Sequence, residues 1–189
     1  MAQVSFGIKG GLNSSSLKNY EKLFAIKDMP PDIQACMENE QRVGFNLGIF
    51  LQLEVPYTNF FFQPELLFSN QGSKAKEEYR TALNGIDFTH KSSHQITLNY
   101  LQLPVYLGYK LRLGASSILV GAGAYYAYGL WDSKYISENK EFKRSDAGVG
   151  LMAGLEIRKF QIKADYDYSL LTSSSLRNRT FKVAFGYIF

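Results

Sequence analysis

Only a few residues of this 189-residue chain have the types and spacing that catalysis or metal binding requires. His90 and His94 are four residues apart, a spacing that zinc sites use when a helix presents both imidazole rings on one face. The sequence around them indicates neither a helix nor further ligands, so we expect no metal and no cofactor. His94 with Ser92 or Ser93 is the start of a serine hydrolase arrangement, but serines are common in loops. We therefore expect no catalytic residue here.

Two other motifs have a chemical interpretation and a structural one. Asp165 and Asp167 form the kind of carboxylate pair that acid–base catalysis uses, but Lys163 shares their face of a strand and favours an ion-pair network. The glycines of Gly121-Ala122-Gly123 lack the strand, turn and helix context of a phosphate-binding loop. Neither motif predicts an enzyme.

The elements that hold these residues are strands. Between residues 42 and 54, large apolar side chains alternate with polar residues and glycine, which describes a strand with one apolar and one polar face. The same alternation predicts eight strands in all, at residues 4–11, 42–54, 60–69, 96–111, 118–128, 148–157, 160–169 and 181–189.

The connections between these strands alternate in length. Long polar segments (12–41, 70–95 and 131–145) are expected as loops, with a short helix near residues 32–40, and they alternate with short turns at 56–59, 113–116 and 158–159. Outer-membrane barrels have long external loops, short periplasmic turns and an even number of antiparallel strands. The sequence therefore predicts an all-β fold, an eight-stranded antiparallel up-and-down transmembrane β-barrel whose two termini lie on the periplasmic side.

Local irregularities are expected at three places. Pro64 interrupts the third strand and predicts a bulge, because proline lacks the backbone N–H that a ladder needs. Ile96 and Leu98 are out of phase with the rest of their strand, which also indicates a bulge or the barrel rim. Cys36 lies in a polar segment, and we interpret it as an unpaired loop thiol.

The alternation alone does not say which face points into the barrel, and a soluble lipocalin-like ligand carrier would place the apolar face inside. Glycines share the parity of the charged residues, and a narrow eight-stranded lumen has no room for the many large apolar side chains. We therefore expect the polar face inside, where buried charges must neutralise one another. The sequence predicts a salt-bridged plug formed by Lys9, Arg42, Glu65, Glu156, Lys163, Asp165, Asp167 and Lys182.

Composition agrees with a membrane barrel and excludes other classes. Aromatic residues make up 15% of the chain and charged residues only 20%, and the net charge of +4 is too small to indicate nucleic-acid binding. No apolar run reaches the roughly 18 residues of a membrane-spanning helix. We expect a single barrel domain over residues 1–189, in a mature form whose signal peptide is already removed.

Several segments together resemble the PorT-like family of outer-membrane β-barrels. They are spread along nearly the whole chain: Phe6-Gly7-Ile8-Lys9-Gly10-Gly11-Leu12-Asn13, Gln63-Pro64-Glu65-Leu66-Leu67-Phe68-Ser69, Tyr100-Leu101-Gln102-Leu103-Pro104 and the glycine-rich strand at 148–157. Where that family usually has a carboxylate, this chain has Gln102, which argues against an acidic role at this position. The aromatic end, Tyr187 and Phe189, looks like the signal by which the barrel assembly machinery recognises its substrates.

The resemblance implies location more than activity. It implies a bacterial outer-membrane protein in contact with outer-membrane lipids and lipopolysaccharide, with the barrel assembly machinery as a partner during biogenesis. We expect a non-enzymatic structural or accessory subunit that contacts a larger outer-membrane complex through its loops or barrel wall. The alternative is an outer-membrane enzyme that acts on lipid A or peptides at the extracellular rim.

Overall fold

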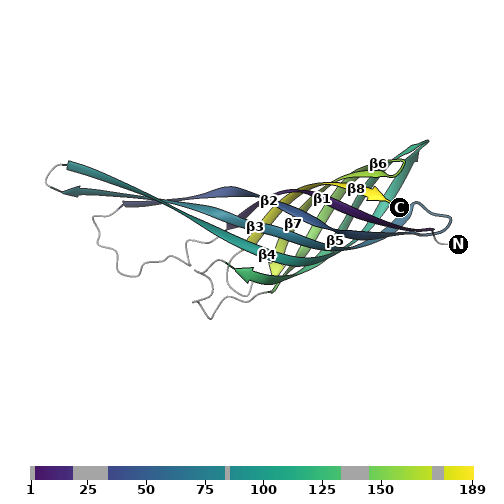
Figure 1. Cartoon of the computed structure of the whole chain (residues 1–189), viewed down its shortest axis with the longest axis horizontal. Coiled ribbons are helices and arrows are strands. Elements are labelled where there is room, and N and C mark those ends of the chain that lie inside the picture. Colours follow the sequence, from purple (N-terminus) through teal and green to yellow (C-terminus); the bar gives the residue numbers. More distant parts are fainter. Residues whose placement is uncertain (1–2, 19–33, 84–85, 133–144, 172–176) are drawn as a thin grey trace.

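The computed structural model describes residues 3–18, 34–83, 86–132, 145–171 and 177–189, and every long element in these ranges is a strand. Eight antiparallel strands follow one another in chain order and form a closed barrel (Figure 1). The predicted fold class is confirmed. The strands are β1 (Gln3–Lys18), β2 (Gln34–Glu54), β3 (Phe60–Leu83), β4 (Ile86–Leu113), β5 (Ser116–Asp132), β6 (Ser145–Ile157), β7 (Phe160–Leu171) and β8 (Arg177–Ile188).

The barrel closes through pairing of its first and last strands. The β1–β8 ladder runs from Gly7 opposite Ile188 to Lys18 opposite Arg177. The ends of β1 and β8 nearest the chain termini lie at the same end of the barrel, as expected (Figure 1). In the described ranges, no helix has the length and apolar character to cross a membrane.

The two faces of the wall have the orientation that the sequence predicts. Along β8, Lys182 is 1% exposed and points inward, whereas its neighbours Phe181 and Val183 are 48% and 44% exposed. Soluble monomers rarely expose a continuous apolar surface of this extent. Every strand contributes to it, with Phe6, Leu47, Phe62, Leu107, Val120, Leu151, Ile162 and Phe185 as examples.

The three predicted short turns join the strands at the end where the termini lie. Each contains one residue with a positive φ angle: Tyr57 (60°), Gly114 (64°) and Arg158 (56°). Tight hairpins need such left-handed residues because their twist then matches that of the strands. Only Gly114 adopts this conformation without a side-chain penalty.

The prediction of loops at residues 12–41 and 70–95 is wrong over most of the described part. Strand β1 continues to Lys18, β2 begins at Gln34, and β3 and β4 continue as a hairpin in which Leu83 pairs with Ile86. Residues 34–40, expected near a short helix, are strand, and Cys36 pairs in register with Glu78. These segments lack the alternation of apolar and polar residues, because that alternation arises only where one face of a strand contacts lipid or an apolar core. Residues 19–33, 133–144 and 172–176 lie outside the described part.

The bulges differ from the prediction at one of two positions. The register is continuous on both sides of Pro64, so the bulge expected there is absent. A register shift does occur in the β4–β5 ladder between Asn99 and Tyr100, near the expected place. A further shift in the β2–β3 ladder lies between Gln41 and Asn46. It contains Gly44, where an added Cβ would lie 1.9 Å from the Asn70 carbonyl oxygen.

Candidate functional site

Four charged side chains form a tetrad in the lumen. Lys9 of β1 lies 2.5 Å from Glu65 of β3 and 3.8 Å from Asp165 of β7. Lys163 of β7 also pairs with Glu65 and lies 3.1 Å from Asp165. All four side chains are at most 1% exposed. Two lysines and two carboxylates make a neutral group that links strands on different sides of the barrel, as a buried ionic cluster must if it is to be tolerated.

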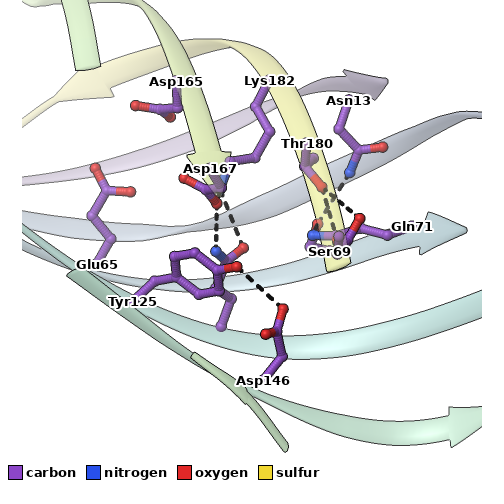
Figure 2. Close-up of polar contacts among 12 residues, drawn as sticks. Asn13, Glu65, Ser69, Gln71, Tyr125, Asp146, Asp165, Asp167, Thr180 and Lys182 are labelled. Carbon is purple, nitrogen blue, oxygen red and sulfur yellow. Dashed lines mark hydrogen bonds and ion pairs between the residues drawn. The ribbon is translucent and has the colours of Figure 1, made fainter. Parts of the chain in front are cut away.

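A second group lies beside the tetrad, two residues further along β7 from Asp165 to Asp167 (Figure 2). Lys182 donates to Asp167 across 2.5 Å, and Gln102 donates to the same carboxylate oxygen at 2.6 Å. The Gln102 carbonyl in turn accepts from Lys182 at 3.2 Å. A carboxylate at position 102 would place two negative charges against one lysine. The amide therefore fits this site because it satisfies both partners and adds no charge.

The remaining two residues of the predicted plug lie apart from these groups. Glu156 is near the end with the short turns, where it pairs with Lys110 and accepts from Gln161 at 3.0 Å. Lys110 also lies 2.8 Å from Glu54. Arg42 is half-buried and donates to the backbone carbonyl of Gln71 at 2.6 Å. No ion pair joins Arg42 to a carboxylate of the described residues.

Uncharged polar side chains continue the network beyond Asp167 and Lys182, on the side away from Glu65 (Figure 2). Asn13 donates to Ser69 at 3.0 Å, and Gln71 donates to the same hydroxyl at 2.9 Å. Thr180 then donates to Gln71 at 3.2 Å. These contacts join β1, β3 and β8, so the polar side chains cross-link strands that are not neighbours in the wall.

Sequence reasoning missed the apolar part of the plug. Phe61, Tyr106, Leu119 and Met152 form a buried cluster inside the barrel, and Phe50 is 1% exposed. These residues stand in runs that are apolar on both faces, such as Phe60-Phe61-Phe62, where period two gives no signal. The lumenal glycines could have indicated these buried rings, because a glycine in a narrow barrel leaves space for a large neighbouring side chain.

The glycine positions show this directly. A Cβ on Gly108 would lie 2.4 Å from the Phe61 ring, and one on Gly7 would lie 2.3 Å from the Phe50 ring. A side chain that lines a water-filled channel would be accessible to water, yet the lumenal lysines and carboxylates above are almost fully buried. The geometry thus gives a packed and neutralised interior, suited to holding the wall rigid.

The aromatic end of the chain lies in a cluster at the rim with the short turns. Tyr187 contacts Phe160 and Phe189, with ring centroids 5.5 and 5.3 Å apart, and Phe189 stacks on Phe6 at 5.6 Å. Rings at such positions are typical of the aromatic girdle of membrane barrels.

The opposite end carries an extension of three strands. Residues 34–41 of β2, 73–83 of β3 and 86–97 of β4 continue beyond the barrel (Figure 1). In the described part, β1 pairs with β2 only as far as Arg42, and β5 pairs with β4 only as far as Leu98. Both outer strands of the extension therefore leave the barrel without a described strand neighbour on their outer edges.

His90 and His94 lie in this extension, on β4. Residues four apart on a strand are about 13 Å apart, so the spacing has none of the meaning it has on a helix. The register places Ser92 opposite Glu77 and His94 opposite Ala75. Among the side chains that the structure describes, no three His, Cys, Asp or Glu residues gather as a metal site would require.

The model of the outer membrane protein beta-barrel domain matches residues 1–175 of the sequence. This chain belongs to that family. Family membership and the closed barrel place the protein in the bacterial outer membrane, so the apolar exterior of this outer membrane protein beta-barrel domain faces lipid. The long connections and the extension are then extracellular, and the short turns are periplasmic.

Among solved structures, two matches cover nearly the whole chain. Ail, the attachment invasion locus protein of Yersinia pestis, solved with the heparin analogue sucrose octasulfate, is 19% identical, with a TM-score of 0.48 and 99% of each chain covered. Neisserial surface protein A is 11% identical, with a TM-score of 0.49 and 99% of each chain covered. No curated protein matches the sequence.

Proposed function

We propose that this outer-membrane barrel is a non-enzymatic accessory subunit of the PorT-like kind, and that its extracellular strand extension contacts a larger outer-membrane assembly. The extension carries the proposal. Strand edges with unpaired N–H and C=O groups are templates for pairing with another chain, and proteins normally cover or blunt them. Among the described residues, β2 and β4 present two such edges, on opposite sides of the sheet that they form with β3.

The interior supports a structural role over transport. Lys163 and Lys182 are each 1% exposed, and both are held by carboxylates and amides from other strands. Phe61 and Tyr106 fill the lumen beside them. To cross the barrel, a solute would have to displace buried ion pairs and aromatic rings together. The exterior and the extension are therefore the surfaces through which the protein would contact other molecules.

The test compares wild type with a variant that has a short extension. Ser73 pairs with Ile96, so residues 74–95 can be replaced by an Asn-Gly turn that closes a two-residue hairpin at this register. Both proteins are purified from native membranes in mild detergent, and heat-dependent electrophoretic mobility verifies that each barrel is folded. We expect partner proteins to accompany wild type and to be absent from the variant. Recovery of the same proteins with both would contradict the proposal.

A second candidate is the outer-membrane enzyme acting on lipid A or peptides. The observation that favours it is the register, which brings Ser92 opposite Glu77, with His90 and His94 two positions away on either side. A variant with both His90→Ala and His94→Ala would lose lipid A or peptide turnover if this candidate holds. Absence of turnover in wild type would remove it.

A further inference from the structure

One charged side chain stands on the lipid-facing wall. In β8, Arg179 has the parity of Phe181 and Val183, which are exposed, whereas Thr180 and Lys182 point into the lumen. At every other outward position with a described side chain, from β1 to β8, the residue is uncharged. An arginine at such a position is costly in hydrocarbon, so its placement requires a physical reason.

The depth of Arg179 in the membrane gives part of that reason. Arg179 is ten residues from Phe189, which belongs to the aromatic cluster at the periplasmic rim. At about 3.3 Å per residue and a tilt of about 40°, ten residues rise about 25 Å, which is the height of the apolar band of such barrels. Arg179 therefore lies at the boundary between acyl chains and headgroups of the outer leaflet.

The guanidinium is oriented by an aromatic ring and not by a carboxylate whose side chain the structure describes. It lies over the ring of Tyr168, its register partner on β7, with 5.2 Å between the guanidinium carbon and the ring centroid. Its Nε is buried and has no hydrogen-bond partner, and no carboxylate of the described residues pairs with it. The aromatic ring thus holds in place a planar group whose donors fit a phosphate bidentately.

Two further basic residues occupy register positions next to Arg179. The β1–β8 ladder pairs Ser16 with Arg179 and Lys18 with Arg177. Three basic residues therefore occupy adjoining register positions at the extracellular end of this seam.

We propose that Arg179, supported by Tyr168, binds a phosphate group of lipid A in the outer leaflet. The site lies on the barrel wall at the β7–β8–β1 junction. It is separate from the strand extension and does not depend on the accessory role proposed above.

The chain offers a matched control at the opposite rim. Lys159 lies 5.8 Å from the ring centroid of Tyr187, so it is also a cation beside a ring, at the edge of the barrel wall. It lies in the β6–β7 turn on the periplasmic side, where the leaflet contains phospholipid. Lys159→Gln removes a charge of the same kind on the other side of the membrane.

The experiment measures lipid bound to wild type, Arg179→Gln, Arg179→Lys and Lys159→Gln by native mass spectrometry, after heat-dependent mobility has verified folding. Purified barrels in detergent are titrated with bisphosphorylated lipid A, with dephosphorylated lipid A, with phosphatidylglycerol and with inorganic phosphate. We expect Arg179→Gln to weaken binding of bisphosphorylated lipid A about ten-fold or more, the range of a charge-assisted contact. Arg179→Lys should lie between it and wild type, and Lys159→Gln should bind as wild type.

Removing the phosphates from lipid A should weaken its binding to wild type as much as the Arg179→Gln change does. Equal binding by wild type and Arg179→Gln would overturn the proposal, as would an equal loss in Lys159→Gln. Equal affinity for phosphatidylglycerol or for inorganic phosphate would overturn it as well, because the site would then not select lipid A. If Arg179→Gln does not fold, Arg179→Lys supplies the comparison, and unchanged binding by it would count against bidentate recognition.

Discussion

Lys182 of β8 and Asp167 of β7 lie 2.5 Å apart inside the barrel, and Gln102 of β4 contacts both. Neither charged side chain is more than 3% exposed. Each charge is therefore tolerated only because the other is present, and the amide completes the polar contacts between them.

This pair predicts a strongly non-additive response to mutation. Lys182→Met or Asp167→Asn alone leaves an uncompensated buried charge, so each should lower the free energy of unfolding by about 3–5 kcal/mol. The double variant should lose less than the sum of the two, with a coupling of about 0.5–3 kcal/mol. Urea unfolding in lipid vesicles measures all four proteins. Strict additivity would show that the two groups do not interact.

Two glutamates test whether burial decides the value of an ion pair. Glu65 contacts Lys9 and Lys163 in the lumen, and Glu54 contacts Lys110 and Arg112 at the periplasmic rim, where the Arg112 side chain is 47% exposed. Glu65→Gln should cost about 3–5 kcal/mol and Glu54→Gln about 1 kcal/mol. Only the contribution of Glu54 should decrease in 1 M salt, because a partly solvated pair is screened. Similar costs at both positions would contradict the plug.

The lipid-facing assignment of the wall predicts a dependence on depth. Leu47→Arg, in the middle of the outward face of β2, should lower stability by about 2–4 kcal/mol, whereas Val43→Arg near the extracellular end should cost about 0–1 kcal/mol. Both residues are well exposed, at 63% and 67%, so packing is matched. Unfolding in vesicles measures the difference, and equal tolerance would remove the assignment of faces.

The lumenal glycines predict overpacking. Gly108→Ala brings a methyl group against the buried Phe61 ring and should cost about 1–3 kcal/mol. Gly10→Ala is the control, because its Cβ would meet Leu47 at 3.4 Å, an ordinary contact. Adding Phe61→Leu should partly restore the stability of Gly108→Ala. Loss of stability in the control alone would contradict the packing argument.

The role of the aromatic end in assembly remains a proposal, and one comparison separates it from simple anchoring. Phe189→Ala should reduce the amount of folded barrel in cells but leave refolding of the purified protein into vesicles unchanged. Phe185→Ala is the control, because Phe185 is also outward-facing and exposed on β8, and packs on Phe160 with ring centroids 5.5 Å apart. Equal effects of the two changes in cells would assign Phe189 to anchoring alone.

The sequence predicts the barrel wall well because lipid imposes a period of two on one face of each strand. Leu47 and Asn46, for example, point outward and inward as the alternation requires. The extension at 73–83 and 86–97 could not be predicted, since a strand beyond the bilayer needs only backbone pairing and the sequence there shows no period of two.

For the plug, the sequence predicts which residues point into the lumen but not which of them contact one another. Charge balance in the lumen follows from the polar parity, but the pairing of Glu65 with Lys9 and Lys163 depends on how far the strands shift when the barrel closes. Arg42 is an example. It lies on the same face of its strand as the inward-pointing residues, but at a different height in the barrel from the tetrad, so it bonds the Gln71 carbonyl instead. Phe50 and Phe61 were missed because their neighbours are apolar as well.

Closure through the β1–β8 seam has a consequence for biogenesis. Gly7 finds its partner, Ile188, only after almost the whole chain has been synthesised, so no earlier intermediate has a complete wall. Until β1 pairs with β8, the sheet has two unpaired edges, and the apolar side chains of its outer face are not yet covered. Such long-range pairing is slow and prone to aggregation. The interval before β1 meets β8 is therefore the stage at which this polypeptide is most exposed to aggregation.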